Sequence, residues 1–330
     1  MLNKILDLVR ENLPASATPQ VAAALGRSGS AVVLGSRWEG RVVYSLFAPR
    51  ERTPAVVLKV DTSPTHQPRL YREHEALLRV SQIPNMTELA PAPLGVHECG
   101  DAVVMAQTAL PGTPLNVMLR RRFRHGGRRS ARDHARVLAW LATFRGAASG
   151  STIAIDPETV QQRLAKVLPI DAPGAADLSR WMDKAGADLG PVKVPARPVH
   201  GDLAPSNCFV HRGRMRVLDW EGAVPEGSPL AETLLFLNHY ARAIPGSDTR
   251  MRKPTDTFRE AFLRGGWLGN LTWNTWCREL VGLGLPVEAC RYLFVATLVD
   301  LAGGHASTAH ARRKGSQKNW SKLLALYAVG

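Results

Sequence analysis

Short apolar runs separated by polar turns dominate the first sixty residues of the chain. An amphipathic stretch comes first, and its apolar side chains share one helical face; they are Leu2, Ile5, Leu6, Val9 and Leu13. Three runs of β-forming residues follow at 31–34, 41–47 and 55–60. Because polar or Pro-containing turns join these runs, the pattern predicts a helix followed by an antiparallel meander.

The apolar spacing changes after the meander. Residues 70–78 have a helical pattern, 101–106 form an apolar strand that ends near Pro111-Gly112, and 135–144 return to helical spacing. Further helices are expected within 151–190 and from residue 227 onward. A chain of 330 residues is long enough for two lobes. The pattern therefore predicts a small antiparallel sheet part followed by a larger, mostly helical part.

The most informative chemistry lies in the segment His-Gly-Asp-Leu-Ala-Pro-Ser-Asn at residues 200–207. Asp202 and Asn207 are five residues apart, so they can flank one loop, with the aspartate facing an incoming hydroxyl and the asparagine facing a metal. Asp219 follows in an Asp-Trp-Glu segment at 219–221 and can hold the same metal from the other side. This spacing suits phosphoryl transfer from a metal-bound nucleotide. The alternative is that Asp202 and Asp219 are ordinary turn residues and His200 a packed core histidine.

The residues between these carboxylates predict a β-hairpin. Cys208–Val210 and Met215–Leu218 are apolar enough for two strands, and Gly213 supplies a turn residue between them.

The His-Gly-Asp-Leu-Ala-Pro-Ser-Asn and Leu-Asp-Trp-Glu segments resemble the aminoglycoside phosphotransferase and choline kinase-like superfamily, small-molecule relatives of the protein kinases. The resemblance implies an α+β, bilobal protein kinase-like fold. Its N-terminal nucleotide-binding lobe, with the leading amphipathic helix, would cover 1–106, and its catalytic and acceptor-binding lobe 107–330. It also implies an ATP-dependent phosphotransferase that moves the γ-phosphate to a hydroxyl of a small molecule, with ATP or GTP and Mg²⁺ as cofactors.

By this resemblance, Asp202 orients the acceptor hydroxyl or accepts its proton, and Asn207 and Asp219 bind Mg²⁺. Lys59 steadies the α and β phosphates. It lies in a strand whose neighbours are expected to be buried, where an unpaired ammonium is costly. Glu73 matches the family pattern and is predicted to form an ion pair with Lys59, while Glu75 faces solvent. An exposed lysine at a strand end is the alternative.

The resemblance also suggests the residues around the nucleotide. Ser36, in the first turn of the meander, is expected near the phosphates, although a plain hairpin turn fits the same sequence. Met105 is expected beside the adenine ring, and the backbone of Ala106 to Thr108 at the adenine edge. Glu221 is left with two roles, as a ligand of a second metal or as a structural residue.

The composition, with 45% hydrophobic and 21% charged residues, is that of a soluble globular protein, and no apolar run is long enough to span a bilayer. The four cysteines are scattered without a CxxC pair, which argues against a zinc site or a disulfide framework and favours a cytoplasmic location.

The net charge of +14 is concentrated in part within Arg120–Arg136. Eight arginines lie in this segment; they are Arg120, Arg121, Arg122, Arg124, Arg128, Arg129, Arg132 and Arg136. Either this is a solvated basic surface, or it binds nucleic acid or another polyanion. If the segment borders the acceptor cleft, a neutral or anionic sugar or metabolite is favoured over a polycationic aminoglycoside. An antibiotic-inactivating kinase and a non-catalytic nucleotide-binding or nucleic-acid-binding protein remain the alternatives.

Overall fold

The computed structural model describes residues 2–26, 28–34, 40–121, 127–146, 150–244, 253–305 and 314–330, with the side chains of 314 and 315 left out. Ser36, the predicted phosphate-loop residue, lies outside this part of the chain, as do Arg122 and Arg124 of the Arg-rich segment.

The chain forms two compact units. The first contains residues 1–113 and 209–221, and the second contains 114–208 and 222–330. The sequence had placed a single boundary after Ala106. The division falls after Thr113 instead, and the later segment returns to the first unit, because the β-hairpin that carries Asp219 folds with the sheet rather than with the helices.

The first unit is built on a five-stranded antiparallel sheet with the order β1-β2-β3-β5-β4. The strands are β1 (Ser30–Val33), β2 (Arg41–Phe47), β3 (Val56–Asp61), β4 (Pro93–Cys99) and β5 (Ala102–Thr108). The three predicted runs of the meander and the predicted strand near 101–106 are confirmed. Strand β4 was not predicted from the sequence, because it begins at Pro93 and a proline at this point is more typical of a turn.

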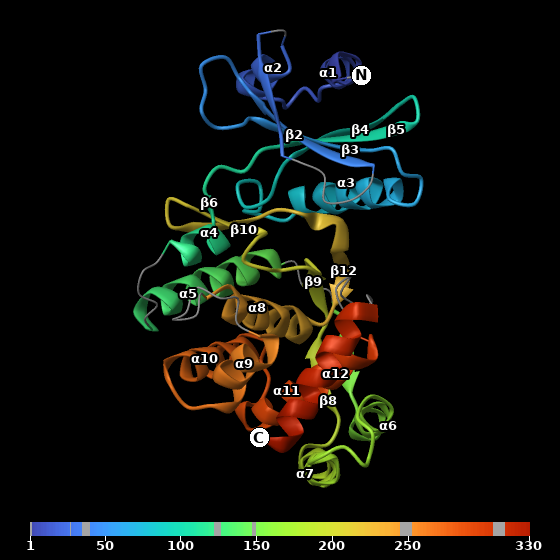
Figure 1. Ribbon diagram of the computed structural model, residues 1–330, viewed down its shortest axis with the longest axis vertical. Coiled ribbons are helices and arrows are strands. Elements are labelled where there is room, and N and C mark those ends of the chain that lie inside the picture. Colours follow the sequence, from blue (N-terminus) through green and yellow to red (C-terminus); the bar gives the residue numbers. More distant parts are fainter. Residues whose placement is uncertain are drawn as a thin grey trace. The chain divides into compact units, whose positions relative to one another are not determined.

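Helices cover both faces of this sheet (Figure 1). On one face lies α3 (Gln67–Ser81), whose buried side includes Leu70, Glu73 and Leu77. On the other lie α1 (Leu2–Glu11) and α2 (Pro19–Ala24), whose apolar residues form one core cluster with those of β3 and β5. Within α1, Ile5 and Val9 are completely buried, so the amphipathic helix is confirmed.

Strands β10 (Cys208–His211) and β11 (Arg214–Val217) form the predicted hairpin. Its two turn residues, Arg212 and Gly213, both have positive φ angles, of 48° and 81°. Two consecutive left-handed residues define a type I′ turn, whose twist matches that of the two strands it joins. A short 3-10 helix over Trp220–Gly222 follows the hairpin.

The second unit is mainly helical. Its helices are α4 (Leu115–Arg120), α5 (Gly127–Phe144), α6 (Pro157–Val167), α7 (Ala175–Leu189), α8 (Pro229–Ala243), α9 (Pro254–Phe258), α10 (Trp267–Gly282), α11 (Cys290–Gly303) and α12 (Lys314–Val329). A π-helical turn over Arg259–Leu263 and a 3-10 turn over Val287–Ala289 join some of them. Its short strands are β7 (Thr152–Ile155), β8 (Val192–Pro195), β9 (Arg197–Val199) and β12 (Val224–Gly227), and the two-residue strand β6 (Thr113–Pro114) crosses the unit boundary.

Helices α8 and α11 are the most completely buried helices of this unit. Nearly every residue of α8 is buried, including Glu232, and α11 is apolar on all sides, which is typical of a helix surrounded by other helices. All four cysteines are free thiols, and Sγ of Cys277 lies 3.0 Å from Sγ of Cys290. In the part of the chain that is described, no helix has the length and apolar character needed to span a bilayer.

Candidate active site

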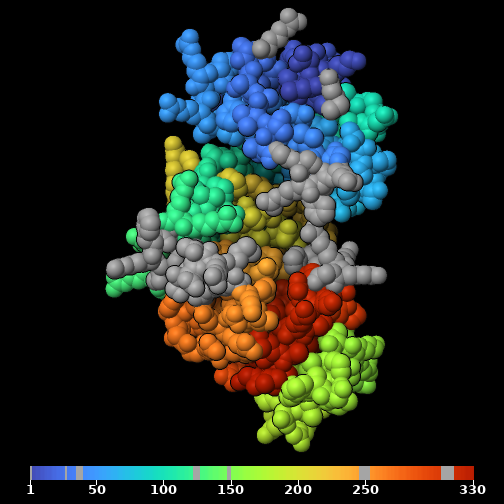
Figure 2. Space-filling model, viewed as in Figure 1, coloured from blue at the N-terminus to red at the C-terminus, as the bar shows by residue number. Residues whose placement is uncertain are grey.

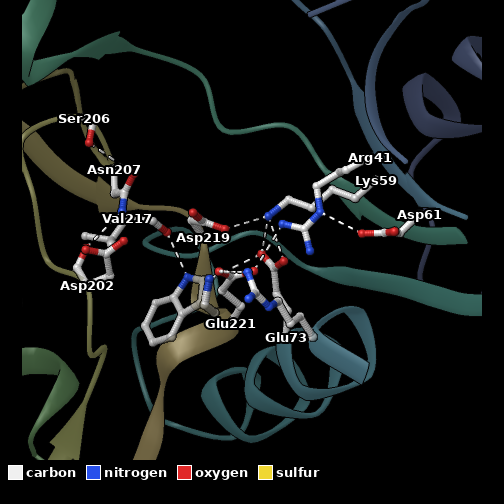
Figure 3. A network of polar contacts seen from close by, with 12 residues as sticks. Arg41, Lys59, Asp61, Glu73, Asp202, Ser206, Asn207, Val217, Asp219 and Glu221 are labelled. Carbon is white, nitrogen blue, oxygen red and sulfur yellow. Dashed lines mark hydrogen bonds and ion pairs between the residues drawn. The ribbon is translucent and has the colours of Figure 1, made fainter. Parts of the chain in front are cut away.

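Lys59, on β3, is held between two carboxylates of the first unit. Its Nζ donates to both carboxylate oxygens of Glu73, each at 2.7 Å, and to Oδ1 of Asp219 at 2.9 Å (Figure 3). The Lys59–Glu73 ion pair predicted from the sequence is therefore confirmed. Glu75 is exposed and lies 4.0 Å from Arg79, as its place on the other side of α3 predicted.

The two carboxylates keep Lys59 charged although it is only 8% exposed. Burial alone would lower the pKa of its ammonium group, but the charges of Asp219 and Glu73 outweigh that effect and raise the pKa. Lys59 therefore presents a fixed positive charge to its surroundings at any physiological pH.

The position of Asp219 depends on the residue that follows it. Trp220 is completely buried, its indole N–H donates to the carbonyl of Val217 at 3.0 Å, and its backbone N–H donates to Glu73 at 3.3 Å. Asp219 itself has a left-handed backbone, with φ at 70°. Such a conformation costs a non-glycine residue on the order of 1–2 kcal/mol. The buried tryptophan offsets this cost and aims the Asp219 carboxylate at Lys59.

A second set of ion pairs surrounds Glu221. Arg41, the first residue of β2, donates to Asp61 at 3.1 Å and to Glu221 at 3.2 Å, and Arg69 lies 3.9 Å from Glu221. Burial opposes the charge of Arg41, but Glu221 and Asp61 raise its pKa. Of the two roles left open for Glu221, these contacts favour the structural one. The sequence did not single out Arg41, since its partner Glu221 lies 180 residues away.

A cavity of about 450 Å³ lies in the first unit, against the α3 side of the sheet. Its apolar walls include Val43, Val57, Leu110, Phe209 and Leu218, and its polar lining includes Arg41, Lys59, Gln107 and Asp219. A mostly apolar cavity with a few convergent polar groups is the usual form of a small-molecule site.

Of the residues predicted beside the base, Met105 and Ala106 to Thr108, only some line this cavity. Thr108 lines it, but Met105 and Ala106 are completely buried and do not. Ala106 belongs to the core cluster on the opposite face of the sheet. The backbone N–H of Thr108 donates to Ala92 at 2.9 Å, so it is already occupied. The lining contributed by this segment is instead Gln107 to Leu110, a shift toward the end of β5.

In the second unit, Glu232 of α8 fixes the backbone at the start of the His-Gly-Asp loop. Its carboxylate oxygens accept from the N–H of His200 at 2.7 Å and from the N–H of Gly201 at 2.9 Å. Gly201 has a φ of 81°, a left-handed conformation that favours glycine at this position. Burial raises the pKa of Glu232, while Arg145 and the two N–H groups oppose that shift.

The same loop is closed by its own side chains. Nδ1 of His200 accepts from the N–H of Asp202 at 3.3 Å, and Nδ2 of Asn207 donates to the carbonyl of Asp202 at 2.9 Å. This second bond assigns the amide nitrogen of Asn207 to the loop, so that its oxygen, which Ser206 reaches at 3.3 Å, is the atom available as a ligand (Figure 3).

Arg145 compensates the buried charges around Glu232. It forms an ion pair with Glu279 of α10, donates to the carbonyl of Pro229 at 3.0 Å, and has Glu232 as a favourable charge nearby. Burial lowers its pKa to about 10, at which it is still charged near neutrality. Sequence reasoning missed this residue, since its main partner lies 134 positions away.

The ligand chemistry fits a magnesium ion that is held by few protein groups. Among the described residues, no three His, Cys, Asp or Glu side chains are arranged as a metal cage. Mg²⁺ bound with a nucleotide needs no such cage, because it takes one or two protein oxygens together with phosphate oxygens and water. In the first unit, Asp219 supplies such carboxylate oxygens next to Lys59, and 32% of its side chain is exposed.

The family assignment comes from a family model, described as the phosphotransferase enzyme family APH, that matches residues 30–267. The chain belongs to this phosphotransferase family. The matched range includes Lys59, Glu73, the His-Gly-Asp loop and Asp219, and the sheet and helical units are those of its kinase-like fold, as predicted. No curated protein matches the sequence significantly.

Solved structures to which the chain is similar include two aminoglycoside phosphotransferases and an amicoumacin kinase. A point variant of aminoglycoside 2'-phosphotransferase-IIIa in complex with GDP is 9% identical, covers 97% of this chain and 95% of its own, and has a TM-score of 0.49. Aminoglycoside phosphotransferase APH(3'')-Id from Streptomyces rimosus is 12% identical, and the match covers 90% of this chain and 98% of that one, with a TM-score of 0.46. Amicoumacin kinase hAmiN, in complex with AMP-PNP, Ca²⁺ and Ami, has 14% identity, 98% and 92% coverage, and a TM-score of 0.43. Since all three scores lie below 0.5, the family assignment depends on the sequence match alone.

Proposed function

We propose that this phosphotransferase moves the γ-phosphate of a purine nucleoside triphosphate to a hydroxyl group of a small molecule. The observation that carries the proposal is Lys59, a buried and charged lysine held by Glu73 and Asp219 at the polar end of an apolar cavity. A structural ion pair has no need of a cavity of about 450 Å³ beside it.

The cavity offers different chemistry to the two ends of a nucleotide. Val57, Leu110 and Leu218 provide apolar walls for a flat base, and Lys59, with Arg41 in the same lining, provides positive charge for phosphates. Lys59 already donates to two carboxylates, so an incoming phosphate oxygen would compete with Asp219, the more exposed of its two partners. Release of Asp219 from Lys59 would leave that carboxylate for Mg²⁺.

The His-Gly-Asp loop is assigned the acceptor side of the reaction. We assign Asp202 to orient the acceptor hydroxyl and take its proton, and Asn207 and Asp219 to hold Mg²⁺. When bound, Mg²⁺ would neutralise charge on the phosphates during transfer. These residues belong to different units of the chain, and their joint action is part of the proposal. In support, the loop backbone is fixed by Glu232, and transfer depends on positioning more than on strong basicity.

The charge of the second unit favours an acceptor without multiple positive charges. Arg120 and Arg121 at the end of α4 are exposed, as are Arg128, Arg129 and Arg132 of α5. Figure 2 shows α4, coloured green, at the surface of the face drawn. A positive potential repels polycationic molecules and attracts phosphorylated or carboxylated ones. We therefore propose a neutral or anionic sugar or metabolite as the acceptor.

The test is transfer of labelled phosphate from γ-labelled Mg·ATP, and separately Mg·GTP, by the full chain. Three acceptor sets are compared: neutral sugars and nucleosides, phosphorylated or carboxylated metabolites, and polycationic aminoglycosides, with an acceptor-free reaction as the control. A labelled product from either of the first two sets supports the full proposal. A product from aminoglycosides alone would overturn the acceptor assignment. The absence of both transfer and Mg-dependent nucleotide binding would overturn the function.

A further inference from the structure

Gln107, the penultimate residue of β5, is a buried polar side chain in the wall of the nucleotide cavity. It is 4% exposed, and its Oε1 has no hydrogen-bond partner among the residues that the structure describes. A buried amide oxygen that lacks a hydrogen-bond partner costs free energy, so a partner from outside the protein is expected for it. Because Gln107 lines the cavity, rotation of its amide would let a ligand bound there supply the missing partner.

The sheet register places Gln107 away from the charged end of the cavity. Across the neighbouring strands, Gln107 pairs with Val57 and Val57 pairs with Ser45, and all three line the cavity. Lys59 lies two residues further along β3, and Arg41 pairs with Asp61 two residues beyond that. Since phosphates belong with Lys59 and Arg41, Gln107 is on the side left for the base.

The backbone near Gln107 leaves the recognition to side chains. The N–H of Thr108 donates to Ala92 and the N–H of Ala109 donates to Ala55, each at 2.9 Å. The hydroxyl oxygen of Thr108 also accepts from the N–H of Ala92, at 2.8 Å. Among the buried side-chain atoms that line this end of the described cavity, Oε1 of Gln107 lacks such an internal partner.

We propose that the Gln107 carboxamide reads the 6-position of a purine base, and that it accepts both adenine and guanine there. This inference rests on the proposed function. A primary amide carries an acceptor oxygen and a donor NH₂, and rotation by 180° about its last bond exchanges them. With the oxygen inward, it accepts from the 6-amino group of adenine. With the nitrogen inward, it donates to the 6-oxo group of guanine. The enzyme then uses ATP and GTP with similar affinity.

The experiment is calorimetric titration of the full chain with three Mg-bound nucleotides: ATP, GTP and purine riboside triphosphate, which has hydrogen at the 6-position. For the unmodified chain we expect ATP and GTP affinities within about tenfold of each other, and both about tenfold above that of purine riboside triphosphate. Gln107→Leu should abolish this advantage by weakening ATP and GTP and leaving the third nucleotide unchanged.

A second variant separates the two bases. Gln107→Glu can accept from adenine but cannot donate to guanine when ionised, so GTP affinity should fall at least about tenfold more than ATP affinity. Gln161→Leu serves as the matched control. Gln161 lies on α6 of the second unit, where it pairs with Ser179 of the same unit, and it does not line the cavity. This substitution should alter none of the three affinities.

Three outcomes would overturn the inference. They are a preference of more than about a hundredfold between ATP and GTP in the unmodified chain, an equal loss for all three nucleotides in both Gln107 variants, and an unchanged profile in those variants. If the unmodified chain binds nucleotides but the profile of its variants is unchanged, the inference fails and the proposed function stands. If it binds none of the three, both fail.

Discussion

Two buried carboxylates fix side chains and backbone of the candidate site. Glu73 accepts from Lys59 and from the backbone of Trp220, and Glu232 accepts from two consecutive backbone N–H groups of the His-Gly-Asp loop. The structure shows that both oxygens of Glu232 reach the loop, with Arg145 as the nearby positive charge.

Glu232→Gln should therefore slow phosphate transfer more than it weakens nucleotide binding. The amide NH₂ of glutamine would face one of the two backbone donors, which leaves a buried donor without an acceptor and costs about 1–3 kcal/mol of unfolding free energy. We expect a lower kcat with little change in nucleotide Kd. Glu226→Gln, at an exposed position of β12, is the control. Equal kcat in the two variants would show that Glu232 does not brace the loop.

The sequence could predict an ion pair where a charged residue lies among apolar neighbours. Lys59 lies in an apolar strand, so a nearby carboxylate was expected, and the helix fourteen residues later supplied Glu73. Arg41 and Arg145 could not be found this way. Each is an ordinary charged residue in sequence, and its role depends on contacts with Glu221 and Glu279 that form only when distant segments fold together.

At the scale of elements, the β10–β11 hairpin connects the His-Gly-Asp loop with the Asp219 segment along the chain. Its left-handed turn at Arg212 and Gly213 leads into β11, which ends two residues before Asp219. Gly213 has open space around its Cα, so an added methyl group would clash with nothing. Glycine is favoured at this position because of its left-handed backbone, not because of a lack of space.

Gly213→Ala should thus destabilise the protein by about 1–2 kcal/mol, the cost of a left-handed alanine. Gly282→Ala is the matched comparison, because Gly282 ends α10, has no positive φ, and also has open space around it. That substitution should be neutral or stabilising by up to about 1 kcal/mol. Urea unfolding of both variants gives the two values. If both variants change the unfolding free energy with the same sign and size, the left-handed backbone of Gly213 does not determine the effect.

The elements that were predicted and those that were missed differ in their local signals. Helices α1, α3 and α8 and the hairpin have periodic apolar patterns or turn residues that act within a few positions. Strand β4 begins at a proline, and β7 pairs with β8, almost forty residues later, through only four residues each. Such short, non-local pairs carry little periodicity, so single-sequence reasoning assigned 151–190 to helices alone.

At the scale of the whole molecule, the core of the second unit contains a histidine that stays neutral. His134 of α5 is 2% exposed, its Nδ1 bonds to the hydroxyl of Thr275 at 2.8 Å, and its ring packs edge-on against Tyr240. Burial lowers its pKa to about 3, although Asp133 opposes the shift. Folding therefore excludes a proton that the unfolded chain binds below about pH 6.5.

The stability contributed by this histidine is complete above pH 6.5 and is lost as the pH falls toward 3. Between pH 7 and pH 5 the loss should be about 2 kcal/mol. His134→Gln removes the titrating group, so its unfolding free energy should fall less over this range. Urea unfolding at several pH values measures the difference, in which the contributions of other histidines cancel. Parallel pH profiles for the two proteins would contradict the assignment.

The central claim, that this chain is a phosphotransferase whose acceptor is activated by Asp202, is tested most directly by one comparison. Phosphate transfer from γ-labelled Mg·nucleotide would be measured for the unmodified chain, for Asp202→Asn, and for Asp183→Asn, a control at an exposed position of α7. We predict that Asp202→Asn lowers transfer at least about a hundredfold while nucleotide affinity and thermal stability stay unchanged, and that the control keeps full activity. Near-normal turnover in Asp202→Asn would contradict the account.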